Sequence, residues 1–243
     1  MYFDIHSHIL PEVDDGAKSI EEAVHLLEAS KKNGVKAIIA TPHFYPNEVY
    51  FEDFLELTTT VFEALKSEIK GKELPDIYLG CEILYFRGLG LVEDLDKLTL
   101  ADSKYLLIEL TAFDIREYFF EDITALMERG YIPIIAHIER YQHFTGFKKI
   151  MKFVVEKNIA VQLNAQSVLE LKYKRTVKGI LKSGVFCVIA SDTHSVEHRP
   201  PKILEALNRI GEVFGEEYRQ RITENSHHLY KKITGDSIGK PQF

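Results

Sequence analysis

Seven short, mostly apolar runs alternate with amphipathic helical segments along the 243 residues, and this alternation constrains the fold more than any other feature. Several runs are almost continuously apolar, such as YLLIEL at 105–110 and IPIIAHI at 132–138. Such runs are typical of parallel strands that are covered on both faces. The predicted strands are Tyr2–His8, Val35–His43, Ile77–Ile83, Tyr105–Leu110, Ile132–Ile138, Ala160–Ala165 and Phe186–His194.

Helical patterns separate these strands. Ser19 and Glu22 form a capping box, and Gly34 ends the helix that follows it. The other predicted helices are 51–70, 119–129, 147–157, 177–182 and 201–214, followed by a more polar helical tail from about residue 216. Repeated βα units predict a closed barrel or an open doubly wound sheet. No G-x-G-x-x-G motif follows a strand, so nothing favours a dinucleotide site. We expect one α/β domain over residues 1–243.

Charge and composition exclude several classes of protein. The formal net charge of -7 argues against non-specific nucleic-acid binding, which needs a basic face. Two cysteines imply no disulfide framework and are compatible with a reducing compartment. The N-terminus lacks the features of a signal peptide, and no apolar stretch approaches the length that spans a bilayer. We therefore expect a cytoplasmic protein without membrane insertion.

Side chains that can bind metal recur at the carboxyl ends of the predicted strands. In the first strand, His6 and His8 should point the same way because strand side chains alternate. In a barrel, these strand ends converge on one mouth, where such enzymes react. The candidate ligands are His6, His8, Asp15, His43, Glu82, Glu109, His137, Asp192 and His194.

The composition of this set indicates a metal centre. Four carboxylates in one cleft would repel each other, and two or three divalent cations would remove that repulsion. Mixed nitrogen and oxygen ligands favour zinc, iron or manganese over magnesium or calcium alone. One histidine at a strand end is usually structural, but packing does not explain ligand types at six of seven strand ends. The chemistry alone leaves the choice between Asp14 and Asp15 open.

Two arginines follow strand ends that carry candidate ligands. Arg140 and Arg199 could each capture phosphate oxygens through a bidentate guanidinium, although surface salt bridges are the alternative. Cys81 to Arg87 matches the Cys-x5-Arg pattern of cysteine-dependent phosphatases. The residues between them are bulky, whereas a phosphate loop needs small ones, so we interpret this match as chance.

The motifs together resemble those of the PHP superfamily (polymerase and histidinol phosphatase). They are D-I-H-S-H, T-P-H, G-C-E-I, L-I-E-L, A-H-I-E-R-Y and A-S-D-T-H followed by R-P-P. D-D-G-A-K and H-I-E-R-Y resemble one branch, the bacterial manganese-dependent protein-tyrosine phosphatases of capsule and exopolysaccharide synthesis. The resemblance covers Tyr2 to about Pro201. It implies a distorted (β/α)7 TIM-like barrel, the PHP fold, with three metals.

The resemblance also implies how the ligands are shared. The first metal takes His6, His8, Glu82 and Asp192; the second takes Glu82, Glu109 and His137; the third takes Asp15, His43 and His194. Mn²⁺ is the expected metal, with up to three ions, and Fe, Zn, Co or Mg are possible. Arg140 and Arg199 would hold the phosphoryl group, and His194 or a metal-bound water would supply a proton.

The implied activity is hydrolysis of phosphotyrosine in the tail of a bacterial tyrosine kinase that controls capsule synthesis. The residues themselves indicate only a phosphoester. Three alternatives stay open: a histidinol-phosphate phosphatase of the same superfamily, a metal-dependent amidohydrolase, and a non-catalytic PHP module. A module of that last kind should have lost ligands, and this sequence keeps all nine.

Overall fold

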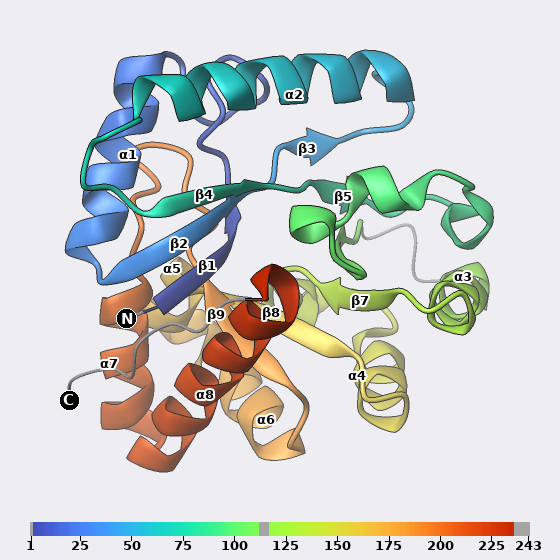
Figure 1. The fold of residues 1–243 in the computed structure, drawn as a ribbon. Coiled ribbons are helices and arrows are strands. Elements are labelled where there is room, and N and C mark those ends of the chain that lie inside the picture. The colour runs from blue at the N-terminus through green and yellow to red at the C-terminus, as the bar shows by residue number, and fades with distance from the viewer. Residues whose placement is uncertain (1, 112–116, 236–243) are drawn as a thin grey trace.

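Parallel strands form a ring that helices cover on the outside in the computed structural model, which describes residues 2–111 and 117–235 (Figure 1). The strands are β1 (Tyr2–Ser7), β2 (Val35–Ala40), β3 (His43–Phe44), β4 (Asp76–Leu79), β5 (Glu82–Leu84), β6 (Tyr105–Glu109), β7 (Ile132–Ile135), β8 (Ala160–Asn164) and β9 (Cys187–Ala190). The α-helices are α1 (Ile20–Lys32), α2 (Phe51–Glu68), α3 (Glu117–Glu128), α4 (Phe147–Glu156), α5 (Ala165–Leu169), α6 (Lys174–Ser183), α7 (Ile203–Phe214) and α8 (Glu216–Thr234). Short 3-10 helices lie at Leu89–Leu91, Leu95–Leu98, Leu100–Asp102, Ile138–His143 and Leu171–Tyr173.

The strands pair in an order that closes the ring. Among the described residues, one parallel sheet has the order β1-β2-β4 and the other has the order β3-β5-β6-β7-β8-β9. Backbone hydrogen bonds then link β1 to the residues that follow β9, from Asp192 N to the His6 carbonyl and from His8 N to the Thr193 carbonyl. The chain itself joins the two sheets where β2 leads into β3 and β4 leads into β5. The seven positions around the ring confirm the predicted distorted (β/α)7 barrel.

Two predicted strands are each divided in two, and this is where the barrel is distorted. The predicted strand Val35–His43 becomes β2 and β3, because Pro42 has no backbone N–H for a ladder bond. The predicted strand Ile77–Ile83 becomes β4 and β5 at Gly80. A Cβ on Gly80 would come within 2.9 Å of Leu100 and 3.0 Å of Ile39, so this close approach requires glycine. The interruption leaves β3 and β5 in one sheet and β2 and β4 in the other.

The first helix begins as its sequence predicts. The Ser19 side chain accepts a hydrogen bond from Glu22 N, and Glu22 Oε2 accepts one from Lys18 N. Ala23, Leu26 and Leu27 recur at helical spacing and are buried. The other outer helices pack on the ring in the same way, through one large cluster of buried apolar side chains. The short helix α5 and the 3-10 helices are additions that the sequence analysis did not predict.

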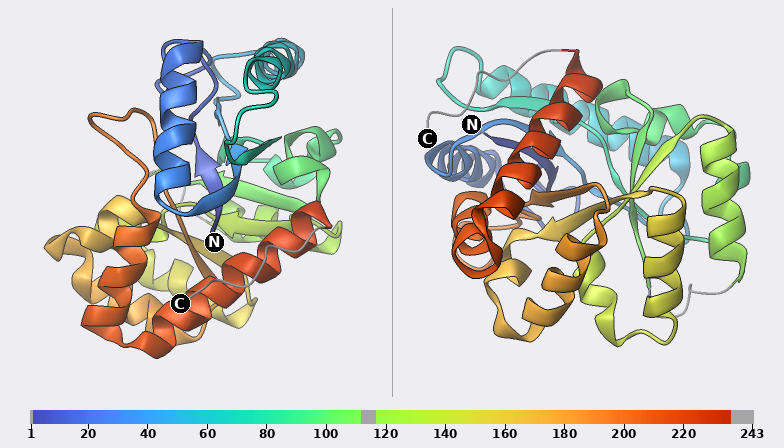
Figure 2. Two further views of the ribbon diagram at one scale, coloured as in Figure 1. Left: turned by 60° about the vertical axis from the view of Figure 1, so that its left-hand side comes forward. Right: turned by 90° about the horizontal axis from the view of Figure 1, so that it is seen from below.

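Helix α8 closes the amino-terminal end of the ring, which we call the floor (Figure 2). Its buried residues Leu229, Tyr230 and Ile233 join the apolar side chains that fill the barrel. The Tyr230 ring meets Phe3 of β1 edge to face at 4.9 Å. The Ser226 hydroxyl contacts both the N–H and the carbonyl of Phe3. The most polar of the predicted helices therefore covers the floor of the barrel with its apolar side.

The helical tail predicted from about residue 216 corresponds to α8. The prediction of one domain over residues 1–243 includes residues 1, 112–116 and 236–243, which lie outside the described residues, and it stays a prediction. In the described part of the chain, no helix is long and apolar enough to cross a bilayer.

Candidate metal centre and active site

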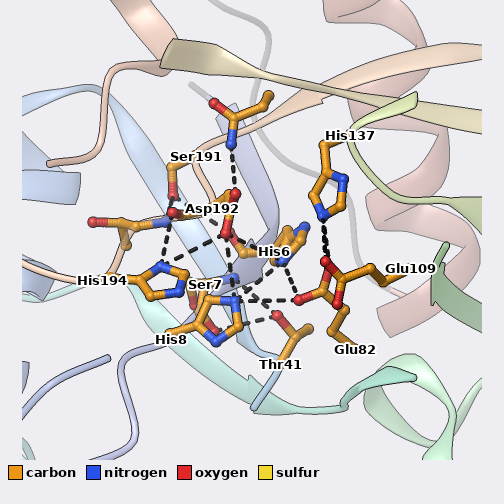
Figure 3. A network of polar contacts seen from close by, with 12 residues as sticks. His6, Ser7, His8, Thr41, Glu82, Glu109, His137, Ser191, Asp192 and His194 are labelled. Carbon is orange, nitrogen blue, oxygen red and sulfur yellow. Dashed lines mark hydrogen bonds and ion pairs between the residues drawn. The ribbon is translucent and has the colours of Figure 1, made fainter. Parts of the chain in front are cut away.

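The nine predicted ligands lie together at the carboxyl end of the ring, which we call the mouth. Figure 3 shows seven of them, without Asp15 and His43. The inner face of each strand changes from apolar to polar toward this end. On β6, Leu107 belongs to the apolar filling and Glu109, two residues later, faces the cluster. The register of the parallel ladder places His43 beside Glu82, on β3 and β5. Figure 3 shows His6, Glu82, Glu109 and His137 converging from separate strands.

The first implied set brings several donor atoms close to the two histidines of β1 and the residue that follows it. The Nε2 atoms of His6 and His8 are 3.2 Å apart and lie 3.1 and 3.5 Å from Glu82 Oε2. They lie 3.5 and 3.4 Å from Asp192 Oδ1. Two donors bound at about 2.1 Å to one cation are roughly 3.0–3.4 Å apart in octahedral or tetrahedral geometry. His6, His8 and Asp192 therefore form one group of close donor atoms, and Glu82 lies near both histidines but outside that group.

The other two sets are present with small differences from the implied sharing. His137 Nε2 lies 2.9 Å from Glu82 and 3.5 Å from Glu109, as a second metal would require. His43 is also close to both carboxylates, with Nδ1 at 3.0 and 3.8 Å. His8, Asp15, His43 and His194 form the third group, so His8 borders two of the three groups.

The structure distinguishes the two neighbouring aspartates. Asp15 Oδ1 lies 3.1 Å from His194 Nε2 and 3.5 Å from His43 Nε2, with its side chain 64 % exposed on the open side of the cluster. Asp14 instead accepts from His8 Nδ1 at 2.7 Å and from His43 N at 3.1 Å. Asp15 therefore lies among the candidate ligands, and Asp14 lies behind them.

Local backbone geometry holds this loop and the ligand turns. Gly16 packs so tightly under β1 that a Cβ there would lie 2.1 Å from the His8 carbonyl oxygen, so no other residue fits. His137 and Asp192 both have positive φ, 28° and 52°, which is uncommon for residues with a side chain. Such conformations persist only where the surrounding structure enforces them, and they cluster at functional sites.

Hydrogen bonds fix which ring nitrogen of two histidines faces the cluster. His8 Nδ1 lies 2.7 Å from an Asp14 oxygen, and His194 Nδ1 lies 3.0 Å from the Asp192 carbonyl. A carbonyl can only accept a hydrogen bond, and an ionised carboxylate also only accepts, so each Nδ1 carries the proton. Each Nε2 therefore presents a lone pair to the cluster, as a metal ligand must.

The buried carboxylates and unpaired polar atoms of the cluster favour the binding of cations. Burial raises the pKa of Glu82, but His6 and contacts from His137 and His43 outweigh it and hold that pKa well below its usual range. Burial and the neighbouring Glu82 raise the pKa of Glu109 to about 7. Glu82 Oε2, His43 Nδ1 and His194 Nε2 are buried without a hydrogen-bond partner. Unpaired buried donors and acceptors are rare in proteins, and cations would satisfy these.

Both predicted arginines reach the cluster, where they contact a candidate ligand. Arg140 Nη2 and Arg199 Nη2 donate to Asp192 Oδ2 at 2.6 and 2.7 Å. Their side chains are 33 % and 38 % exposed, so part of each guanidinium faces the mouth. The loop after Asp192 folds back through a bond from Thr193 Oγ1 to the Arg199 carbonyl, which brings Arg199 to the site.

Several residues at the site are absent from the sequence prediction. Asn164 Nδ2 donates to Asp192 Oδ2 at 2.6 Å, and Gln162 Oε1 accepts from His137 N at 2.7 Å. The Tyr141 hydroxyl lies 3.1 Å from His137 Nδ1. One signal was available: Gln162 and Asn164 are the polar pair in the otherwise apolar strand β8, two residues apart and so on one face.

The Cys-x5-Arg match is chance, as the sequence suggests. The Cys81 thiol is buried and donates to the Leu98 carbonyl. Burial and Glu82 raise the pKa of Cys81 well above its usual value, whereas a nucleophilic cysteine needs a lowered one.

Comparison with known proteins now identifies the family. The model of the capsular polysaccharide synthesis family CpsB/CapC matches residues 2–231. The chain belongs to the CpsB/CapC family. It is 33 % identical to the tyrosine-protein phosphatase YwqE of Bacillus subtilis (strain 168), over 95 % of this chain and 92 % of that protein. It is 30 % identical to the tyrosine-protein phosphatase CpsB of Streptococcus agalactiae serotype III, over 94 % of this chain and 98 % of that protein.

Solved structures agree with this CpsB/CapC membership. A chain from the crystal structures of YwqE from Bacillus subtilis and CpsB from Streptococcus pneumoniae, described as unique metal-dependent tyrosine phosphatases, matches with a TM-score of 0.84. The two chains are 29 % identical over 96 % of this one and 95 % of the other. An Escherichia coli phosphotriesterase homology protein matches at 10 % identity and a TM-score of 0.53, which shows a shared fold alone.

Proposed function

We propose that this CpsB/CapC member is a metal-dependent phosphatase that hydrolyses phosphotyrosine in a protein. The observation that carries the proposal is the cluster of nine histidine and carboxylate side chains at the mouth, flanked by two arginines. The tyrosine phosphatase names of the relatives and of the matching solved structure support it. All nine side chains are in place, which favours an enzyme over a non-catalytic module.

The metal sets that we propose are those implied by the sequence. His6, His8, Glu82 and Asp192 would hold one ion, Glu82, Glu109 and His137 a second, and Asp15, His43 and His194 a third. When bound, such cations lower the pKa of a coordinated water and neutralise charge on the phosphate. We propose Mn²⁺ as the native metal, since the donor set suits it and the resemblance favours it.

The side chains at the bottom of the cluster and those around its opening have different proposed roles. His6 and Glu82 are fully buried at the bottom of the cluster, whereas Asp15 is exposed and Arg140 and Arg199 are partly exposed around its opening. A phosphoryl group that enters the mouth would therefore meet the free donors of both guanidinium groups. Arginine donors that point at developing charge stabilise the transition state without reorganising at the moment of reaction.

This reaction needs little assistance from a general acid. A phenolate leaving group has a parent pKa near 10, so it needs less acid assistance than an alkoxide. His194 would have to be protonated to act as the acid, but burial and the neighbouring His8 lower its pKa to about 3. We therefore propose that His194 serves as a ligand.

The proposed substrate is the phosphorylated tail of a bacterial tyrosine kinase of capsule synthesis. An accessible, flexible phosphotyrosine suits a site whose deepest ligands are fully buried and whose rim is open. The proposal includes a cytoplasmic location, with which two free buried cysteines are compatible.

The test compares substrates under one condition. We would measure kcat/KM of the Mn²⁺-loaded protein on a phosphotyrosine peptide, the matching phosphoserine peptide and histidinol phosphate. We expect the phosphotyrosine peptide to be preferred by at least tenfold. Preference for histidinol phosphate would replace the proposal with the alternative phosphatase, and no hydrolysis of any phosphoester would refute it.

A further inference from the structure

Strand β8 contributes no candidate metal ligand, yet its inward side chains are polar where those of its neighbours carry ligands. Gln162 and Asn164 follow Ala160 on the inner face, and both amides are almost fully buried. Asn164 Oδ1 caps α5 by accepting from Gln166 N, which leaves its Nδ2 to donate to Asp192. Gln162 lies between two other ligands, His6 and His137.

The orientation of the Gln162 amide follows from the donors around it. The backbone N–H of His137 can only donate, and the Gln162 atom that faces it at 2.7 Å must therefore be an acceptor. The amide nitrogen in that place would set two donors against each other. The oxygen Oε1 is consequently fixed toward His137, independently of how the amide is assigned.

The same oxygen decides the protonation of His6. Gln162 Oε1 lies 3.2 Å from His6 Nδ1, and an amide oxygen has two lone pairs and can accept a second bond. Because this oxygen cannot donate, Nδ1 of His6 carries the hydrogen. Nε2 then presents its lone pair toward Glu82 and Asp192, at 3.1 and 3.5 Å.

We propose that Gln162 is a positioning residue that sets the metal-binding tautomer of His6 and holds the left-handed backbone of His137 through one oxygen atom. It would thereby couple the first metal set to the second. The inference rests on the proposed metal ligands. A hydrogen bond of this kind, to the nitrogen opposite the metal, orients the imidazole and raises its basicity.

The neutral amide suits this place better than a carboxylate. Gln162 Nε2 is buried without a partner, which is unfavourable in itself. A glutamate would offer the same acceptor without a buried N–H₂ group, but it would add a negative charge beside four carboxylates. Glutamate at this position therefore serves as a probe, because it keeps the acceptor and changes only the charge.

The experiment compares Gln162→Met, which removes the acceptor at similar volume, with Gln162→Glu, which keeps it. Mn²⁺ affinity and stoichiometry are measured by titration against a chromophoric chelator. In Gln162→Met we expect the affinity of the sets with His6 and His137 to fall roughly 10–100-fold. The set with Asp15, His43 and His194 should bind as before, and Gln162→Glu should recover most of the loss.

Gln142→Met is the control, because Gln142 likewise has a buried Nε2 without a hydrogen-bond partner, but its Oε1 accepts from Thr176 and not from His137. Unchanged Mn²⁺ affinity in Gln162→Met, or an equal loss in Gln142→Met, would overturn the inference. A wild-type protein that binds no metal would instead refute the proposed function.

A second measurement needs no variant. Long-range ¹H–¹⁵N NMR on the wild-type protein reports which ring nitrogen of His6 is protonated. It can be recorded with or without bound Zn²⁺, a diamagnetic ion. We expect the Nδ1–H form. The Nε2–H form would contradict the role of Gln162 even if the variants do not fold.

Discussion

The two ends of the barrel are built from the same strands and differ in almost every other respect. At the floor, Phe3 packs against Tyr230 and Leu229 of α8 in an apolar cluster. At the mouth, the same strand β1 ends in His6 and His8, which face Glu82 and Asp192. A few residues along one strand therefore separate a region that stabilises the fold from a region built for chemistry.

The difference is one of electrostatics as well as of polarity. Burial of apolar side chains at the floor contributes favourable free energy to folding, on the order of 25 cal/mol per Å². The mouth gathers four carboxylates whose mutual repulsion opposes folding unless histidines and cations offset it. Changes at the mouth should therefore alter metal content and activity, and changes at the floor should alter stability.

Chelation should give the largest effect and should act at the mouth alone. We expect EDTA to abolish phosphatase activity and Mn²⁺ to restore it better than other divalent cations, because the proposed nucleophile depends on bound metal. Far-UV circular dichroism should stay unchanged, since the floor holds the strands together. Full activity after exhaustive chelation, with no metal found by mass spectrometry, would refute the proposed mechanism.

Glu82→Gln should sharpen the contrast between function and stability. Glu82 is fully buried and borders the first two metal sets, so we expect metal loss and a fall in kcat/KM of more than about 100-fold. His143→Gln, an exposed residue after β7, is the control. Equal, mild effects of both changes would contradict the assignment of Glu82.

Leu229→Ala should produce the opposite pattern at the floor. This fully buried side chain lies in the apolar cluster, and its truncation should cost about 2–5 kcal/mol of unfolding free energy in urea titration. The kcat/KM of the folded variant should match wild type, since Leu229 packs in the apolar cluster at the end of the barrel opposite to the mouth. Leu57→Ala on the outside of α2 is the control and should cost little. A loss of metal binding in Leu229→Ala would show that the two ends are coupled.

The arginines should give the smallest of the four effects. We expect Arg140→Ala and Arg199→Ala each to lose at least tenfold in kcat/KM, about 1.4 kcal/mol, on a phosphotyrosine peptide with metal stoichiometry retained. Arg140→Lys should recover part of the loss, because lysine keeps the charge and lacks the fork.

Arg175, exposed on α6, is the control for these variants. Arg129 is less suitable because it donates to the carbonyls of Gly90 and Val92. If Arg140→Ala and Arg199→Ala lose metal instead, their main task is to orient Asp192, which both of them contact.

The sequence predicts the ring and the gathering of the nine side chains because both depend on regular periodicity. Apolar runs mark strands, and ligand types at strand ends must converge in a barrel. The division of two strands depends on particular contacts, such as Leu100 against Gly80, that no local pattern reveals. The choice of Asp15 over Asp14 likewise depends on how the loop folds over Gly16.

The residues that contact and orient the candidate ligands were not predicted, for a different reason. The metal centre was predicted from histidine and carboxylate residues. Gln162, Asn164 and Tyr141 are of other types, so that prediction did not include them. Their role becomes visible only when each donor and acceptor is matched in space.

Because β1 meets the residues that follow β9, the site can form only late in the synthesis of the chain. Asp192 leaves the ribosome about 185 residues after His6 and His8, whose proposed set it completes, and His194 follows two residues later. At about 5–20 residues per second, the early histidines wait on the order of 10–40 seconds for their partners. A growing chain is therefore unable to assemble a complete metal centre, and enzymatic competence arrives only with the last strand.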